Sequence, residues 1–173
     1  DDQAVKQMKA AGVEVEKYNP WRWNTLAQIN NRTHRKIMVV DGRIGYTGGA
    51  GIADEWSGNA EDPKHWRDTH FRLEGPAVAQ MQAAFMENWI EVTGNVLHGE
   101  EYFPELARAG NHAAQFVVSS PGGGSESMQL MYLLSIAAAA KSIKLSAAYF
   151  VPDGVEIRTL AAAARRGVRV QII

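Results

Sequence analysis

No cysteine occurs among the 173 residues, so a disulfide framework is excluded. The chain also lacks any apolar run close to the ~20 residues that a membrane-spanning helix needs. Asp1 and Asp2 open it without the basic and then apolar segment of a signal peptide. We therefore expect any membrane anchor of the full-length protein to lie outside this chain.

Net charge is nearly absent as well. The 18 Lys and Arg residues balance 19 Asp and Glu residues to a net charge of -1, which argues against a globally basic nucleic-acid-binding protein. A local bias exists, because no acidic residue occurs between Asn19 and Val40, whereas four basic residues do: Arg22, Arg32, Arg35 and Lys36. This positive rim suits an anionic phosphodiester.

A predicted hairpin is the most informative stretch. The apolar, β-branched run 37–40 ends at Asp41-Gly42, a strong hairpin signal, and 44–47 predicts the returning strand. Because side chains alternate along a strand, His34 and Lys36 are expected to point the same way, at the mouth of the first strand.

This pair has a chemistry of its own. A neutral histidine is a nucleophile or proton carrier near pH 7, and a lysine is a compact charge for phosphate oxygens. Phosphoryl transfer needs mainly positioning and charge neutralisation. Gly48 and Gly49, after the second strand, are expected to leave room for a ligand beside the backbone. The alternative, a surface His and Lys without function, explains the pair but not its spacing.

The pattern His34-x-Lys36-x-x-x-x-Asp41, followed by Gly48-Gly49, resembles the signature of the phospholipase D superfamily. Residues 66–78, 149–153 and 162–168 resemble segments of its cardiolipin-synthase-like branch. The resemblance implies an α/β fold, a phospholipase D-like α/β/α sandwich with a mixed β-sheet flanked by helices. It also implies metal-free phosphodiester transfer through a phosphohistidine, with no cofactor.

The resemblance assigns roles to single residues. His34 would be the nucleophile or the leaving-group acid, Lys36 would bind non-bridging phosphate oxygens, and Asp41 would support the site. Asp68 matches an acid placed against the far nitrogen of the histidine, where it would fix the tautomer. At Gly51 the chain lacks the Asn that the family often has. Substrate contacts are expected from Arg32, Thr47, Gly48, Gly49 and Tyr149.

The remaining pattern predicts alternating helices and strands. Residues 76–94 form a helix with a buried face of Val78, Met81, Phe85 and Trp89. Further helices are predicted at 4–11, from 125 and at 157–164, and further strands at 13–16, 69–73, 115–119, 143–149 and 168–172. The last strand, helix and strand read as a parallel βαβ unit, so we expect one mixed sheet.

Only one signature is present, whereas the family builds its site from two. Residues 1–97 resemble the C-terminal half of one catalytic domain, 98–112 a linker, and 113–173 the N-terminal half of a second domain. The halves either fold onto each other as a permuted domain or exchange between two chains as a swapped dimer. We favour a two-fold dimer, or a pairing with the missing second half, because the chemistry needs two imidazoles.

The predicted function is phosphatidyl transfer, or phosphodiester hydrolysis, on a phosphatidylglycerol-like phospholipid in a bacterial, membrane-associated protein. One rival is a superfamily nuclease, which the lack of a basic stripe disfavours. The other is a catalytically silent fragment that binds phospholipid. Trp21 and Trp23 are interpreted as packing anchors rather than peripheral lipid contacts, and the run 122–124 as a turn rather than a phosphate loop.

Overall fold

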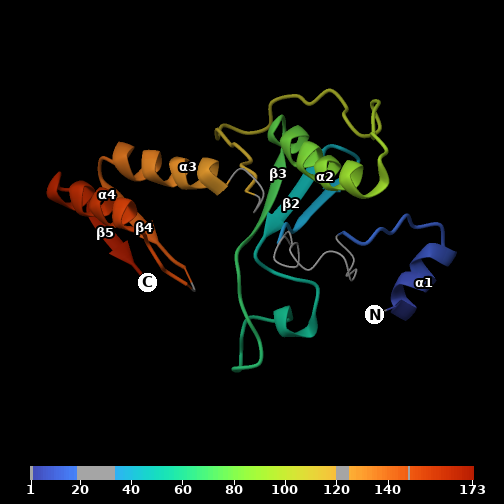
Figure 1. Cartoon of the computed structure of the whole chain (residues 1–173), viewed down its shortest axis with the longest axis horizontal. Coiled ribbons are helices and arrows are strands. Elements are labelled where there is room, and N and C mark those ends of the chain that lie inside the picture. The colour runs from blue at the N-terminus through green and yellow to red at the C-terminus, as the bar shows by residue number, and fades with distance from the viewer. Residues whose placement is uncertain (1, 19–33, 120–124, 148) are drawn as a thin grey trace, which may run out of the picture. The chain divides into compact units, whose positions relative to one another are not determined.

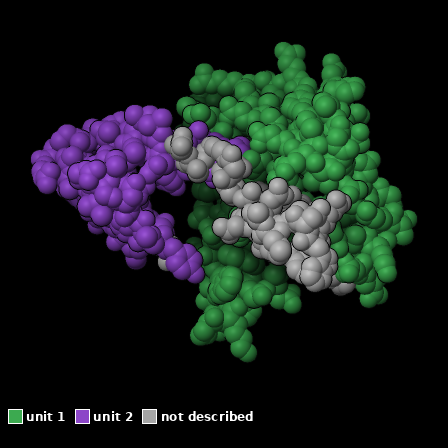
Figure 2. All heavy atoms as spheres, viewed as in Figure 1, with its two compact units in different colours: residues 1–116 green, residues 117–173 purple. Residues whose placement is uncertain are grey.

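The computed structural model describes residues 2–18, 34–119, 125–147 and 149–173 (Figure 1). It divides into two compact units, 1–116 and 117–173 (Figure 2). The stretch expected to be a linker, 98–112, therefore lies within the first unit. Part of it packs on the hairpin turn, since a Cβ on Gly42 would lie 2.7 Å from the Tyr102 carbonyl oxygen and 2.5 Å from Pro104 Cδ.

The first unit is built on an antiparallel sheet with strand order β1-β2-β3. The strands are β1 (Ile37–Val40), β2 (Ile44–Gly48) and β3 (His70–Glu74). Between β1 and β2, Asp41 and Gly42 adopt φ of 53° and 62°, and the Arg43 amide donates to the Val40 carbonyl at 3.0 Å. Positive φ at both positions is what the predicted Asp-Gly turn requires, so the hairpin is confirmed.

Helix α2 (Ala77–Thr93) packs on one face of this sheet (Figure 1). Met81 is fully buried and lies directly on Gly45 of β2, where a Cβ would collide with its sulfur. The helix ends as predicted, because Gly94 takes a left-handed φ of 73°. The predicted buried face is too long, however: Phe85 is 40% exposed. Three short strands give the helix little sheet to cover, so its buried side chains are confined to 77–84.

The N-terminal part of this unit contains helix α1 (Asp2–Ala10), which Gly12 ends as predicted with φ 89°. The strand predicted at 13–16 is wrong, because this segment joins no β ladder. An alternating pattern predicts a strand only where another strand offers its backbone groups.

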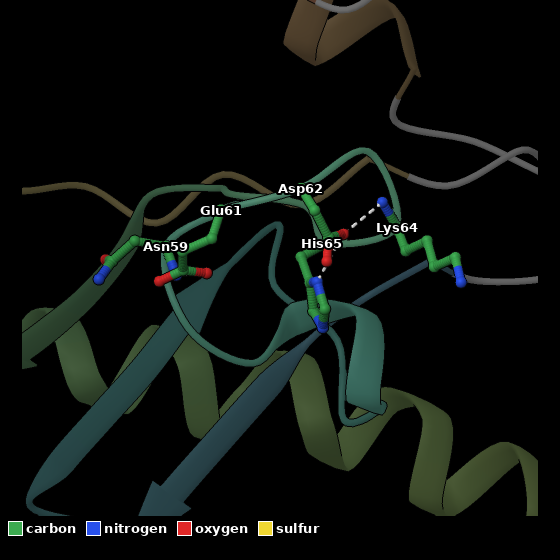
Figure 3. A network of polar contacts seen from close by, with 5 residues as sticks. All are labelled: Asn59, Glu61, Asp62, Lys64 and His65. Atoms are coloured by element: carbon green, nitrogen blue, oxygen red, sulfur yellow. Dashed lines mark hydrogen bonds and ion pairs between the residues drawn. The ribbon is translucent and has the colours of Figure 1, made fainter.

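The connection from β2 to β3 is held by short-range contacts. It includes the 3₁₀ turn η2 (Asp54–Trp56), whose Trp56 ring meets Trp66 edge to face at 5.4 Å. Beyond this turn the loop's own carboxylates bond its backbone and side chains (Figure 3). Asp62 accepts from the Lys64 amide and contacts His65 Nδ1, both at 2.8 Å. Glu61 accepts from the Asn59 amide, and these backbone hydrogen bonds lower the pKa of Glu61.

The second unit is a βαβ arrangement preceded by a helix. Its elements are α3 (Ser125–Ala138), β4 (Ser142–Leu145), α4 (Gly154–Arg165) and β5 (Arg169–Ile172), and β4 pairs with β5 in parallel. The parallel pair and its crossover helix are confirmed. Asp153 caps α4 in a reciprocal capping box with Glu156. The core comprises Ile136, Leu160, Ala163 and Val168.

The described chain is thus mixed α/β, as predicted, but its strands do not form one mixed sheet. The antiparallel and parallel strands lie in two separate sheets, one in each unit. The strand predicted at 115–119, at the boundary of the units, joins neither sheet. Within the described ranges, no helix combines the length and apolarity needed to cross a membrane.

Candidate functional site

His34 and Lys36 directly precede β1, and both are exposed. Arg35, between them, has only 15% of its side chain exposed. The alternation continues into the strand, where Met38 is 55% and Val40 39% exposed. We call the sheet side that carries α2 the closed face and the side of Met38 and Val40 the open face. His34 and Lys36 belong to the open face, so the predicted common direction of this pair matches the burial pattern.

The open face continues across the other two strands. Directly paired residues share a face, and the register aligns Met38 with Tyr46 and Tyr46 with Arg72. Arg72 interacts with Tyr46 and Glu74, and these interactions, that with Tyr46 being the larger, raise the pKa of the Arg72 guanidinium. The face therefore combines apolar side chains with cationic groups and with the carboxylate of Glu74, which forms an ion pair with Arg72.

Gly48 and Gly49 lie where the sheet meets Asp68 and His70. A Cβ on Gly48 would collide with the Thr69 carbonyl oxygen and lie 2.6 Å from His70 Nδ1, and one on Gly49 would collide with the Asp68 carboxylate. The space beside these glycines is therefore filled by the chain itself, where the sequence interpretation expected room for a ligand. Close approach within the chain is the reason for glycine here; substrate binding by Gly48 and Gly49 stays a prediction.

Thr47 and Gly51 have structural partners too. The Thr47 hydroxyl donates to the Lys36 carbonyl oxygen at 2.9 Å, which ties the backbone of the His-x-Lys segment to β2. A Cβ on Gly51 would lie 2.9 Å from Trp56 Nε1, so the indole occupies the place of a side chain at this position. The predicted substrate contact of Thr47 remains untested.

The two acidic residues of the predicted site lie apart. Asp41 is in the hairpin turn, seven residues beyond His34, which is roughly 20 Å along an extended strand. Its positive φ gives it a role in the turn. Asp68 precedes β3 and accepts from the Thr69 amide at 2.6 Å. Between the described residues His34 and Asp68 no hydrogen bond is present, so the pairing of these two side chains stays a prediction.

Two predicted substrate contacts fall elsewhere. Arg32 lies outside the described residues, as do Trp21, Trp23 and the glycines 122–124. Tyr149 belongs to the second unit, where it is 91% exposed. The first unit contains His34, Lys36, Thr47, Gly48, Gly49 and Asp68, and it brings Thr47 to Lys36 and Asp68 to Gly49; Tyr149 is not part of that unit.

Sequence reasoning missed the contacts of Arg35. Its Nη1 donates to the Ala84 carbonyl at 2.9 Å and to Asn88 Oδ1 at 3.1 Å, and lies 3.0 Å from Glu87 Oε2. All three partners are on α2. The signal was present in the sequence, because the alternation that places His34 and Lys36 on one side places Arg35 on the other.

One turn further along α2, Glu91 accepts a 2.6 Å hydrogen bond from the Tyr18 hydroxyl, and this bond is the main reason why the pKa of Tyr18 is raised.

No group of three or more His, Cys, Asp or Glu side chains in the described part of the chain is arranged to hold a metal ion.

Curated proteins similar to this chain are named cardiolipin synthases. The chain is 37% identical over 172 residues to the cardiolipin synthase of Geobacillus thermodenitrificans (strain NG80-2), covering 98% of this chain and 34% of that protein. It is 37% identical to cardiolipin synthase 2 of Bacillus cereus, with the same coverage, and 34% identical over 182 residues to its cardiolipin synthase 1, covering 98% of this chain and 35% of that protein.

The chain thus spans about a third of the length of the curated relatives that it matches. No protein-family model matches it, and no solved structure matches it significantly.

Proposed function

We propose, from the premise that this chain is a cardiolipin-synthase-like relative within the phospholipase D superfamily, that it carries one half of a phosphatidyltransferase site. His34 is the nucleophile that takes up the phosphatidyl group, and Lys36 neutralises the non-bridging phosphate oxygens. The substrate is a phosphatidylglycerol-like phospholipid at a bacterial membrane surface.

One observation supports this proposal above the others. His34 and Lys36 are both exposed on the open face, while Arg35 between them is turned into contacts with α2. An imidazole and an ammonium group are thereby free to meet the same phosphodiester. A packing role does not explain this pair, since neither the His34 nor the Lys36 side chain is buried.

The proposed reaction has two displacement steps. A ring nitrogen of His34 attacks phosphorus, the bond between phosphorus and the leaving alcohol oxygen breaks, and that oxygen takes a proton from a second imidazole. The acceptor hydroxyl then gives its proton to the second imidazole and attacks phosphorus, which releases His34. Lys36 stabilises the charge on the phosphate oxygens in both steps.

The second imidazole has to come from another signature, and we propose a second copy of this chain or a second catalytic half as its source. The exposure of Met38 and Val40 supports this arrangement, because none of the helices that the structure describes in the first unit covers the open face. In a complete α/β/α sandwich both faces of the sheet are covered. In such a pairing two His34 side chains, or His34 and its counterpart, face one phosphate site.

The test is the turnover of a chromogenic phosphodiester by the parent chain and its variants. His34→Ala is expected to abolish turnover without lowering the melting temperature, because the side chain is exposed. Lys36→Ala is expected to lose most of the rate, since one contact to a developing oxyanion contributes ~3 kcal/mol. His98→Ala replaces another exposed histidine and serves as the control.

Three further readouts separate the alternatives. A phosphoryl group on His34 that is labile to acid and stable to base identifies the intermediate, and added alcohol acceptor distinguishes transfer from hydrolysis by its products. Turnover should survive EDTA. Parent-like turnover by His34→Ala contradicts the proposal, whereas binding to anionic vesicles without any turnover by the parent supports the silent-fragment alternative.

A further inference from the structure

The geometry points to Arg35 as a positioning residue: its guanidinium holds the backbone between His34 and Lys36 on helix α2, so that both side chains are presented together on the open face. This inference rests on the proposed function of His34 and Lys36 and adds a residue to it that contacts neither substrate nor reacting atoms.

The segment from His34 to Lys36 is not held by the backbone pairing of the β-sheet. Strand β1 begins only at Ile37, so residues 34–36 lie outside the assigned strand. Hydrogen bonds of the Thr47 and Arg35 side chains hold them instead. The Thr47 hydroxyl of β2 donates to the Lys36 carbonyl oxygen, and the Arg35 guanidinium donates to α2.

The attachment of Arg35 is specific. One nitrogen, Nη1, meets three acceptors that follow one face of α2: the Ala84 carbonyl, the Asn88 amide oxygen and the Glu87 carboxylate. Ala84 is 1% exposed, so the guanidinium reaches the buried side of the helix. Positions i, i+3 and i+4 adjoin one another on a helix, which is why a single guanidinium meets all three.

The consequence is geometric. Residues on either side of a strand position point to the other face, so fixing Arg35 on α2 fixes the opposite direction for His34 and Lys36. The positions of His34 and Lys36 are thereby fixed relative to α2, the helix that also covers the closed face of the sheet. A misplacement of ~1 Å at a reacting group costs up to about 10²-fold in rate.

The test compares Arg35→Met with the parent chain. Methionine keeps an apolar stem and removes every donor. We expect kcat for the chromogenic phosphodiester to fall by up to about 10²-fold with a smaller change in KM. Arg35→Lys should restore part of the loss, because lysine keeps the charge but not the planar donor group. Arg43→Met, an exposed arginine in the hairpin turn, is the matched control and should behave like the parent.

A second readout does not depend on turnover. The backbone order parameter of Lys36, measured by ¹⁵N relaxation, should fall from about 0.85 toward about 0.6 in Arg35→Met and stay unchanged in Arg43→Met. If Arg35→Met fails to fold, Asn88→Ala removes one acceptor from the helix side and should give the same changes at smaller size.

The outcomes separate the two proposals. Parent-like order parameters in Arg35→Met overturn the positioning role, whether or not kcat falls. Parent-like kcat with a mobile Lys36 also overturns it, because the position would then not matter for the reaction. A chain that turns over no phosphodiester but loses order at Lys36 in Arg35→Met retains the positioning role and contradicts the proposed function.

Discussion

The two faces of the three-stranded sheet are formed by alternate residues of the same strands, but α2 covers one face and the other is exposed. On the closed face, α2 buries Met81 against Gly45 and binds Arg35. On the open face, His34, Lys36 and Met38 remain exposed. This difference supports the proposal that the direction of His34 and Lys36 is set by the contacts that Arg35, between them, makes with α2 on the other side of the sheet. The closed face is where substitutions should cost stability, and the open face is where they should cost activity.

The largest expected effect on stability is at the contact between Met81 and Gly45. Met81→Ala empties a fully buried site and should lower the free energy of unfolding by about 2–5 kcal/mol. Gly45→Ala puts a Cβ against the Met81 sulfur and should cost about 1–3 kcal/mol. In the double variant the new Cβ enters space that the methionine has left. The double variant should therefore cost less than the sum of the costs of the two single variants. Urea unfolding measures all three.

Met38→Ala is the matched substitution on the open face. Since this side chain is 55% exposed, it should change the free energy of unfolding by less than about 1 kcal/mol. A cost as large as that of Met81→Ala would break the comparison, because it would mean that the open face is covered in solution. Sedimentation of the same samples then tells whether a second copy covers it.

An effect smaller than that of Met81→Ala and larger than that of Met38→Ala is expected at Gly49, between the sheet and Asp68. Gly49→Ala places a Cβ where the Asp68 carboxylate lies and should displace it, at a cost of about 1–3 kcal/mol. Gly154→Ala is the control, because at this first residue of α4 a Cβ meets only Arg158 Nη1, at 3.2 Å. The double variant Gly49→Ala with Asp68→Ala should recover part of the loss in thermal unfolding. If Gly49→Ala is as harmless as the control, the close approach of Asp68 does not explain this glycine.

Local signals carried most of what the sequence predicted correctly. The hairpin depends on Asp41-Gly42, and the end of α2 on Gly94, each of which needs only its own backbone conformation. The pairing of β4 with β5 follows from the length of the crossover between them. For the candidate site, alternation alone predicted the shared side of His34 and Lys36.

The errors all concern partners that are distant in sequence. The segments 13–16 and 115–119 alternate like strands, but a strand exists only with a neighbour, which the pattern does not contain. Phe85 is on the predicted apolar stripe of α2 and remains exposed because the sheet beneath is narrow. The contact of Gly49 with Asp68 joins positions 19 residues apart, and nothing in either local pattern specifies that approach.

The smallest expected effect lies at the edge of the closed face, where Tyr18 donates to Glu91 near the end of α2. Tyr18→Phe removes a hydrogen bond to a charged acceptor between incompletely buried side chains, so it should cost only about 0.5–1 kcal/mol. The bond raises the pKa of Tyr18 in the folded state above its ordinary value of 10.0. Its contribution to stability should therefore be complete below pH 10 and be lost as the pH rises through the folded pKa.

The pH dependence of this bond also reports on Arg35. The positive charge of Arg35 lowers the pKa of Tyr18, against the larger effect of Glu91. Replacing Arg35 by Met removes that opposing charge, so the Tyr18 hydroxyl should titrate at higher pH in Arg35→Met than in the parent. Ultraviolet titration of the phenolate, with Tyr18→Phe identifying its signal, measures the difference. A shift to lower pH, or no shift, would mean that Arg35 and Tyr18 do not lie side by side against α2. The contact of Arg35 with α2, on which the comparison of the two faces depends, would then lose its support.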